Sequence, residues 1–128
     1  MSNVKILIVD DEPEIVRALG LLLRANGYET VSALDGVQAT QLAMKEQPDL
    51  ILLDICMPGG DGHVVAQRLR ESSKSLAIPI IMLTARTSKD DYDKAHAEGV
   101  VKYITKPYKP ETLLAVIKDA LGQRSPTT

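Results

Sequence analysis

Residues 6–15 read ILIVDDEPEI, in which four aliphatic residues run directly into four carboxylates within five positions. An uninterrupted aliphatic run predicts a strand that is buried on both faces. Pro13 is well placed for the first turn of a helix that follows this strand. Because burying a carboxylate without a partner is costly, the acidic end of the strand requires positive charge from elsewhere.

The rest of the chain repeats this alternation of strand-like and helix-like segments. Nearly continuous apolar runs at 4–9, 49–53 and 78–83 predict central strands, whereas mixed runs at 28–33 and 100–104 predict edge strands. Strands that alternate with helices are typical of a parallel sheet covered on both faces. We therefore predict an α/β fold of three layers, with a flavodoxin-like, doubly wound, five-stranded parallel sheet of order 2-1-3-4-5 and five helices.

Capping residues and prolines mark the ends of the predicted helices. Gly27 ends the first helix, and Asp35 is a good N-cap for a second helix that extends to about Glu46. The other helices are predicted to begin at Asp61 or Gly62, at Ser88 with an end at Gly99, and at Pro110. Each predicted strand is thus followed by one helix.

The composition describes one ordinary globular domain. The chain has 128 residues, 45% of them hydrophobic and 25% charged, with a formal net charge of −2. This length supports a single core. We expect residues 1–121 to form the domain and residues 122–128 (GQRSPTT) to form a flexible tail or the start of a linker.

Charge and hydropathy exclude several classes of partner. Lys and Arg are scattered along the chain, so we expect no direct binding to nucleic acid. No apolar run approaches the ~18 residues of a membrane span, so we expect no membrane insertion. The single cysteine, Cys56, cannot form an internal disulfide, which fits a reducing compartment and predicts a cytoplasmic location.

Functional side chains follow four of the predicted strands. Asp10 and Asp11 follow the first strand, Asp54 the third, Thr84 the fourth and Lys106 the fifth. The carboxyl ends of parallel strands meet at one edge, where such sheets bind their ligands. Three carboxylates there would be balanced by one lysine and one Mg²⁺, which accepts a few oxygen ligands and keeps several waters. Asp54, on the central strand, is the candidate nucleophile for phosphoryl transfer.

The motifs that carry these residues resemble a known family. They are DDE at 10–12, DICMPGGDG at 54–62, LTA at 83–85 and TKPY at 105–108. In order and spacing, over residues 4–121, the chain resembles the receiver domain of two-component response regulators and is similar to the stand-alone chemotaxis-type regulator.

The resemblance implies a phosphoacceptor site that depends on Mg²⁺. Asp54 would accept a phosphoryl group from a phosphohistidine of a sensor histidine kinase or a histidine phosphotransfer domain. Asp11 would bind Mg²⁺ directly and Asp10 mostly through water, and Asp54 and the main-chain carbonyl of Cys56 would complete the metal ligands. The domain would be no enzyme in its own right, because it would promote only its own phosphorylation and dephosphorylation.

The resemblance also implies a switch and a cis peptide bond. Thr84 and Lys106 would contact the phosphoryl oxygens, and Pro107 would follow Lys106 through a cis bond. Thr84 and Tyr103 would act as a coupled switch that reshapes the surface of the fourth helix, fifth strand and fifth helix. A downstream effector or a fused output domain would read this change. A phosphorylation-dependent dimer is also implied, although Val101 and Lys102 replace the two Asp of many members with DNA-binding outputs.

Three alternatives stay open from the sequence. Asp11, taken alone, also fits a helix N-cap in a favourable dipole. An Asp-nucleophile phosphohydrolase would use the same chemistry, but it needs a second Asp two residues after the nucleophile, where this chain has Cys56. A phosphorylation-independent pseudo-receiver would share the fold and lack one of the five site residues, all of which are present here.

Overall fold

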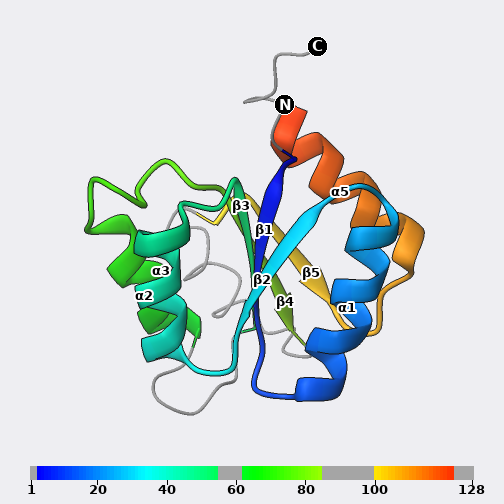
Figure 1. The fold of residues 1–128 in the computed structure, drawn as a ribbon, viewed down its shortest axis with the longest axis horizontal. Helices are drawn as coiled ribbons and strands as arrows, with labels where there is room; N and C mark the ends of the chain where they lie inside the picture. The colour runs from blue at the N-terminus through cyan, green and yellow to red at the C-terminus, as the bar shows by residue number, and fades with distance from the viewer. Residues whose placement is uncertain (1–2, 55–61, 85–99, 123–128) are drawn as a thin grey trace.

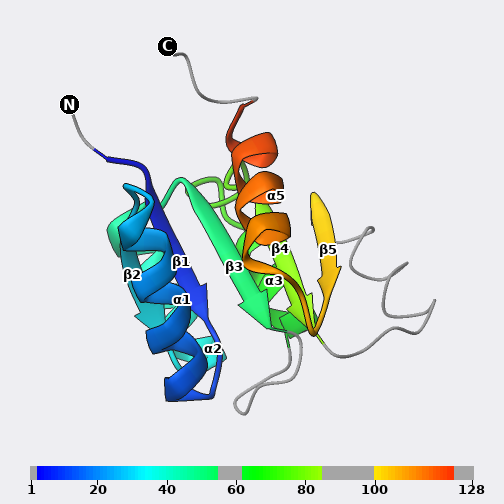
Figure 2. The same ribbon diagram turned by 90° about the vertical axis from the view of Figure 1, so that its right-hand side faces the viewer.

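The computed structural model describes residues 3–54, 62–84 and 100–122. Five parallel strands form one sheet of order β2-β1-β3-β4-β5, as predicted. All five arrows point toward the same end of the sheet (Figure 2). The strands are β1 (Lys5–Val9), β2 (Glu29–Ala33), β3 (Leu50–Asp54), β4 (Ile80–Thr84) and β5 (Lys102–Thr105).

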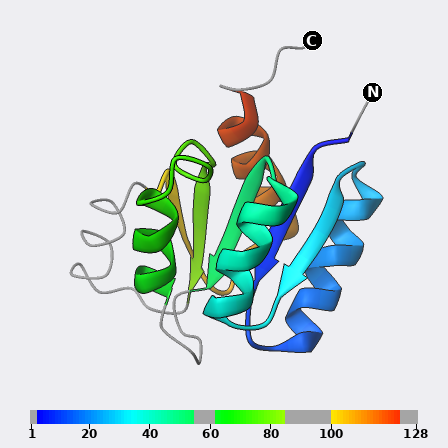
Figure 3. The same cartoon turned by 60° about the vertical axis from the view of Figure 1, so that its left-hand side comes forward.

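Helices cover both faces of the sheet and give three layers (Figure 1). The described helices are α1 (Pro13–Ala25), α2 (Gly36–Glu46), α3 (Gly62–Arg70) and α5 (Pro110–Gly122). α1 and α5 lie on one face, and α2 and α3 lie on the other, where Figure 3 brings them forward. The predicted helix from Ser88 to Gly99 lies outside the described residues.

Alternating side chains of the central strands supply two separate cores. In β1, Ile6 and Ile8 join the cluster beneath α1 and α5, whereas Leu7 and Val9 join the cluster beneath α2 and α3. Every residue of β3 is buried as well. A strand that packs helices on both faces needs apolar residues at successive positions, which explains why the apolar runs predicted the central strands correctly.

The helix ends follow the capping residues. α2 begins after Asp35, whose carboxylate accepts a hydrogen bond from the Gln38 N–H at 2.8 Å. α1 begins at Pro13 and is followed by Gly27, whose φ of 90° lies in the left-handed region that favours glycine. Both helices therefore have the bounds that the sequence predicted to within about two residues.

β4 begins later than its apolar run predicted. The run starts at Ile78, but the strand starts at Ile80. Pro79 lacks an N–H and cannot donate to the ladder, although its carbonyl still accepts a hydrogen bond from the Ile51 N–H at 3.0 Å. Ile78 is buried in the core even though it precedes the strand.

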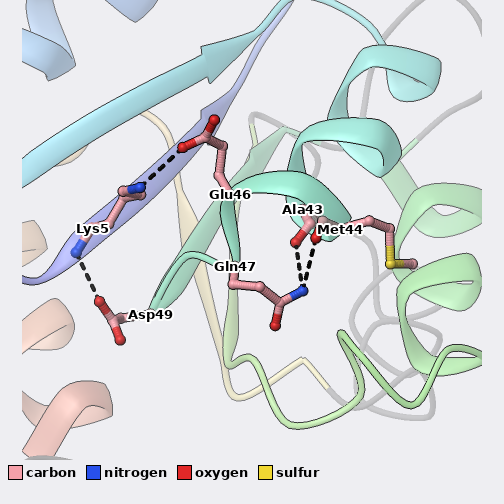
Figure 4. A network of polar contacts seen from close by, with 6 residues as sticks. All are labelled: Lys5, Ala43, Met44, Glu46, Gln47 and Asp49. Atoms are coloured by element: carbon pink, nitrogen blue, oxygen red, sulfur yellow. Dashed lines mark hydrogen bonds and ion pairs between the residues drawn. The ribbon is translucent and has the colours of Figure 1, made fainter.

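At the amino end of the sheet, Lys5 makes polar contacts with two carboxylates (Figure 4). The backbone N–H of Lys5 donates to the Asp49 carboxylate at 2.9 Å, and the Lys5 ammonium donates to Glu46 at 2.9 Å. These contacts join the starts of β1 and β3 to the end of α2. These carboxylates thus have hydrogen-bond partners in Lys5, at the end of the sheet opposite to Asp10 and Asp54.

No helix within the described residues combines the length and apolarity that crossing a membrane would require.

Candidate functional site

The carboxyl ends of β1 and β3 place two buried carboxylates side by side. β1 and β3 are paired in parallel, with Val9 opposite Leu53, so the residues that follow them, Asp10 and Asp54, come to the same edge. Asp10 is 2% exposed and Asp54 is 7% exposed. The topology therefore brings together two side chains that are 44 positions apart in the sequence, as predicted.

Lys106 supplies the positive charge that the acidic end of β1 requires. It follows β5, and its Nζ lies 3.3 Å from Asp10 Oδ2 and 3.5 Å from Asp54 Oδ2. Burial by itself lowers the pKa of Lys106, but the negative charges of Asp54 and Asp10 outweigh it and raise the pKa above its ordinary value. Lys106 is therefore an ammonium at neutral pH and bridges both carboxylates.

Two further carboxylates lie beside Asp10. Carboxylate oxygens of Asp10, Asp11 and Glu12 all lie within 4.8 Å of one another. The Glu12 N–H donates to Asp10 Oδ1 at 3.0 Å, which curls the chain as it leaves β1. Lys106 supplies one positive charge against the four negative charges of these residues and Asp54. The donor set consists of hard oxygen atoms with excess negative charge, which suits Mg²⁺.

The N-cap of α1 is not Asp11. Glu12 occupies the N-cap position, and its side chain makes no capping hydrogen bond to the described first turn. The structure thus gives no support to the alternative in which Asp11 serves as a helix cap.

We predict that Asp11→Ala leaves the metal-free protein as stable as the wild type, or more stable. The substitution removes one of three carboxylates that repel each other, and it removes no helix cap. Urea unfolding in the presence of a chelator measures the free energy of unfolding. A loss of about 1 kcal/mol or more would mean that Asp11 caps the helix after all.

Of the other predicted site residues, the structure describes Thr84 and Pro107 but not Cys56. Thr84 is the last residue of β4 and is paired with Thr105, so the β4 backbone ends at the same edge as β1 and β3. The Lys106–Pro107 peptide bond is cis, as the resemblance implied. Cys56, the source of the expected carbonyl ligand, lies outside the described residues.

Two tyrosines lie on β5 and just after it, on either side of Lys106 in the sequence. Tyr103 is half-buried and packs against the core cluster beneath α2 and α3. Tyr108, two residues after Lys106, packs against the opposite cluster. Burial raises the pKa of the Tyr108 phenol; the Lys106 charge opposes that shift and the Asp10 and Asp54 charges reinforce it. Tyr103 and Tyr108 line one pocket together with Thr112 and Val116 of α5.

The position of Glu12 beside Asp10 and Asp11 was not predicted from the sequence. Asp10, Asp11 and Asp54 were the predicted carboxylates of the site, although Glu12 is part of the DDE motif. The available signal was its position two residues after Asp10 at the end of β1, which keeps its backbone at the same edge of the sheet.

A protein-family model matches most of the chain. The model of the response regulator receiver domain matches residues 6–118. The chain belongs to this family. The match includes every residue that the sequence assigned to the site, from Asp10 to Pro107.

Individual relatives agree with this assignment. The receiver domain is 39% identical over 117 residues to the DNA-binding dual master transcriptional regulator RpaA of Synechocystis, covering 91% of this chain and 48% of that protein. The chain spans about half the length of the curated relatives it matches.

Solved structures match over their full length. The Vibrio cholerae chemotaxis protein CheY4 superimposes with a TM-score of 0.89 at 34% identity, covering 94% of this chain and 100% of that one. The receiver domain of the sensor histidine kinase PA1611 from Pseudomonas aeruginosa, solved with a magnesium ion coordinated in its active-site cleft, gives 0.87 at 30% identity, covering 94% of this chain and 99% of that one. The chain is therefore a phosphoacceptor signalling domain of the two-component type.

Proposed function

We propose that Asp54 is the residue that accepts the phosphoryl group, from a phosphohistidine donor. The observation that carries this proposal is the Lys106 ammonium, which lies 3.5 Å from the Asp54 carboxylate and 3.3 Å from that of Asp10. Asp54 is buried and is the last residue of the central strand β3, and it shares the Lys106 ammonium with Asp10 of the acidic cluster. A nucleophile held in this way needs mainly positioning and charge neutralisation to attack phosphorus.

Each residue of the site has a defined task in this proposal. Asp54 attacks the phosphoryl group, and the bond from phosphorus to the donor nitrogen breaks as the bond to the Asp54 oxygen forms. Lys106 turns from the ground-state carboxylates to the phosphoryl oxygens, and the Thr84 hydroxyl donates to another of these oxygens. Asp10, Asp11, Asp54 and the Cys56 carbonyl hold the metal. When bound, Mg²⁺ neutralises charge on the transferred group.

The proposed partners follow from the family. The donor is a sensor histidine kinase or a histidine phosphotransfer domain, and the output is a separate effector protein or a fused domain. Direct contact with DNA is not part of the proposal for this domain, even though RpaA is named as DNA-binding, because the matched region covers 48% of that protein. The domain acts in the cytoplasm, promotes only its own phosphorylation and dephosphorylation, and comprises residues 1–121.

Incubation with acetyl phosphate and Mg²⁺ tests this function. Intact-mass spectrometry is expected to record the gain of one phosphoryl group, and a chelator is expected to prevent it. A phosphohydrolase would instead turn over generic phosphate esters, and a pseudo-receiver would gain no mass. Either result would contradict the proposal.

We also propose that Thr84 and Tyr103 couple phosphorylation to the surface of β5 and α5. A phosphoryl group brings close to two negative charges, which draw the Thr84 hydroxyl toward Asp54. Tyr103, half-buried on the neighbouring strand, then turns further inward, because packed interiors leave few voids unfilled. Phosphorylation need only bias an equilibrium that already exists. The segment Thr87–Asp91, beneath which space would open, lies outside the described residues.

Amide NMR spectra of the protein with and without beryllofluoride and Mg²⁺ test this coupling. Large shifts are expected to reach Tyr103 in the wild type and to shrink in Thr84→Ala. Shifts confined to the loops around Asp10, Asp54 and Lys106 in the wild type would show that the domain takes up phosphate without this switch.

A further inference from the structure

We infer that Glu12 is a carboxylate of the Mg²⁺ site, where it contacts the ion through a metal-bound water and raises its affinity. This inference rests on the proposed function, which requires a metal at Asp10, Asp11 and Asp54. It adds a residue that the resemblance did not assign. The juxtaposition that carries it is the placement of the Glu12 carboxylate within 4.8 Å of both Asp10 and Asp11.

The Glu12 side chain does not cap the helix, although Glu12 occupies the N-cap position of α1. Glu12 is the N-cap residue of α1, and its carbonyl accepts hydrogen bonds from Ile15 and Val16 at 3.0 and 3.1 Å. An acidic N-cap side chain gains from bonding the free N–H groups of the first turn. The Glu12 side chain makes no such bond to the described first turn and lies with the two aspartates.

The backbone fixes this placement. Asp10 Oδ1 accepts the Glu12 N–H at 3.0 Å while Asp10 Oδ2 lies 3.3 Å from the Lys106 ammonium. The hydrogen bond from the Glu12 N–H to Asp10 therefore keeps the Glu12 backbone at this edge of the sheet. The Glu12 carboxylate adds a third negative charge next to those of Asp10 and Asp11. Like charges at this separation repel, and the attraction of each to a divalent cation bound between them outweighs that repulsion.

A contact through water fits the exposure of Glu12. Among the three carboxylates Asp10 is buried, Asp11 is half-buried and Glu12 is exposed. Mg²⁺ binds oxygen at about 2.1 Å and usually keeps several waters, which donate to carboxylates just outside the metal sphere. Glu12 lies at the solvent side of the cluster, where such waters would be. Its contribution is therefore electrostatic, with one hydrogen bond to a bound water.

Titration with MgCl₂ of the full chain, wild type and Glu12→Gln, tests the inference. Amide NMR shifts or calorimetry give the dissociation constant. We expect Glu12→Gln to weaken Mg²⁺ binding about tenfold at low ionic strength, because it removes one negative charge about 5 Å from a divalent ion. The difference is expected to shrink at high salt, since Glu12 is exposed and screened.

Glu14→Gln is the matched control. Glu14 lies in the first turn of the same helix and carries the same charge, but it is not among the three clustered carboxylates. The control therefore removes the same interaction with the helix dipole and the same net charge. We expect it to weaken Mg²⁺ binding clearly less than Glu12→Gln does at the same ionic strength, because its carboxylate lies outside the cluster and the attraction to the ion falls with distance.

Thermal unfolding separates a metal role from a structural one. Glu12→Gln is expected to unfold at the wild-type temperature or above in a chelator and to gain less from added MgCl₂. If the wild type and Glu14→Gln bind Mg²⁺ and Glu12→Gln binds equally well, the inference about Glu12 fails while the proposed function stands. If the wild type binds no Mg²⁺ at all, the proposed function fails and the inference fails with it.

Discussion

Asp54→Asn is expected to abolish the gain of a phosphoryl group from acetyl phosphate. The amide of Asn is a far weaker nucleophile than a carboxylate, and it offers no anionic ligand to Mg²⁺. We expect at least a hundredfold loss in the rate of labelling, which intact-mass spectrometry measures as the absence of the phosphorylated species. The fold should survive, because the substitution keeps the size of a side chain that is 9% exposed and removes its charge repulsion with Asp10.

Asp49→Asn is the matched control for this experiment. Asp49 immediately precedes β3 and Asp54 ends it, so the same substitution is made at opposite ends of one strand. The side-chain amide oxygen that the substitution introduces can still accept the Lys5 N–H, which Asp49 accepts at 2.9 Å. We expect this variant to be labelled like the wild type. Labelling of Asp54→Asn at the wild-type rate would contradict the assignment of the acceptor.

Lys106→Met is expected to lower the free energy of unfolding by about 2 kcal/mol at pH 7 without metal. Lys106 is 21% exposed, and its removal leaves Asp10 and Asp54, both nearly buried, without the ammonium that bridges them. Leaving a buried charge without its partner is costly, and partial exposure reduces the cost. Urea unfolding measures it, and added Mg²⁺ should restore part of the loss because it supplies positive charge at the same edge.

The pH dependence of this difference has a definite sign. The two carboxylates raise the pKa of Lys106 in the folded protein above its value in the unfolded chain, about 10.4. The stabilisation is therefore complete below about pH 10.4 and is lost as the pH rises through the raised pKa of the folded state. The wild type and Lys106→Met should converge in stability in that alkaline range.

Lys102→Met is the matched control for Lys106→Met. Lys102 lies on β5 and forms an ion pair with Asp119 of α5 at 3.6 Å, in which the two side chains are 47% and 69% exposed. An exposed pair of this kind contributes about 0 to 1 kcal/mol. If Lys102→Met and Lys106→Met cost the same, the bridge between the two buried carboxylates does not contribute as we describe.

The strand order of the sheet could be predicted because the burial of each strand is visible in the order of apolar and polar residues along the chain. A central strand needs apolar residues on both faces, so the apolar runs around Ile6 and Leu50 mark the central strands. Parallel pairing of these strands then places Asp10 beside Asp54. The start of β4 was misplaced because Pro79 keeps the apolar character of the run while it removes one donor from the ladder. Strand bounds depend on such single hydrogen bonds, and apolar patterns do not record them.

The site was predictable only as far as topology determines it. Lys106 was placed correctly because it follows an edge strand whose carboxyl end must reach the same rim. The side chain of Glu12 was not, because its direction depends on the competition between capping the helix and joining the aspartates. The cis bond before Pro107 came from the resemblance, since only about 5–6% of such bonds are cis and no local pattern marked this one.

The position of the phosphoryl group tests the central claim most directly. Borohydride reduces an aspartyl phosphate to homoserine, which marks the acceptor covalently. After labelling with acetyl phosphate and Mg²⁺, reduction and proteolysis, peptide mass spectrometry should find homoserine at position 54 and should not find it when a chelator is present. Homoserine at another aspartate, or phosphate that survives on a serine, threonine or histidine while Asp54 is unmodified, would contradict the account.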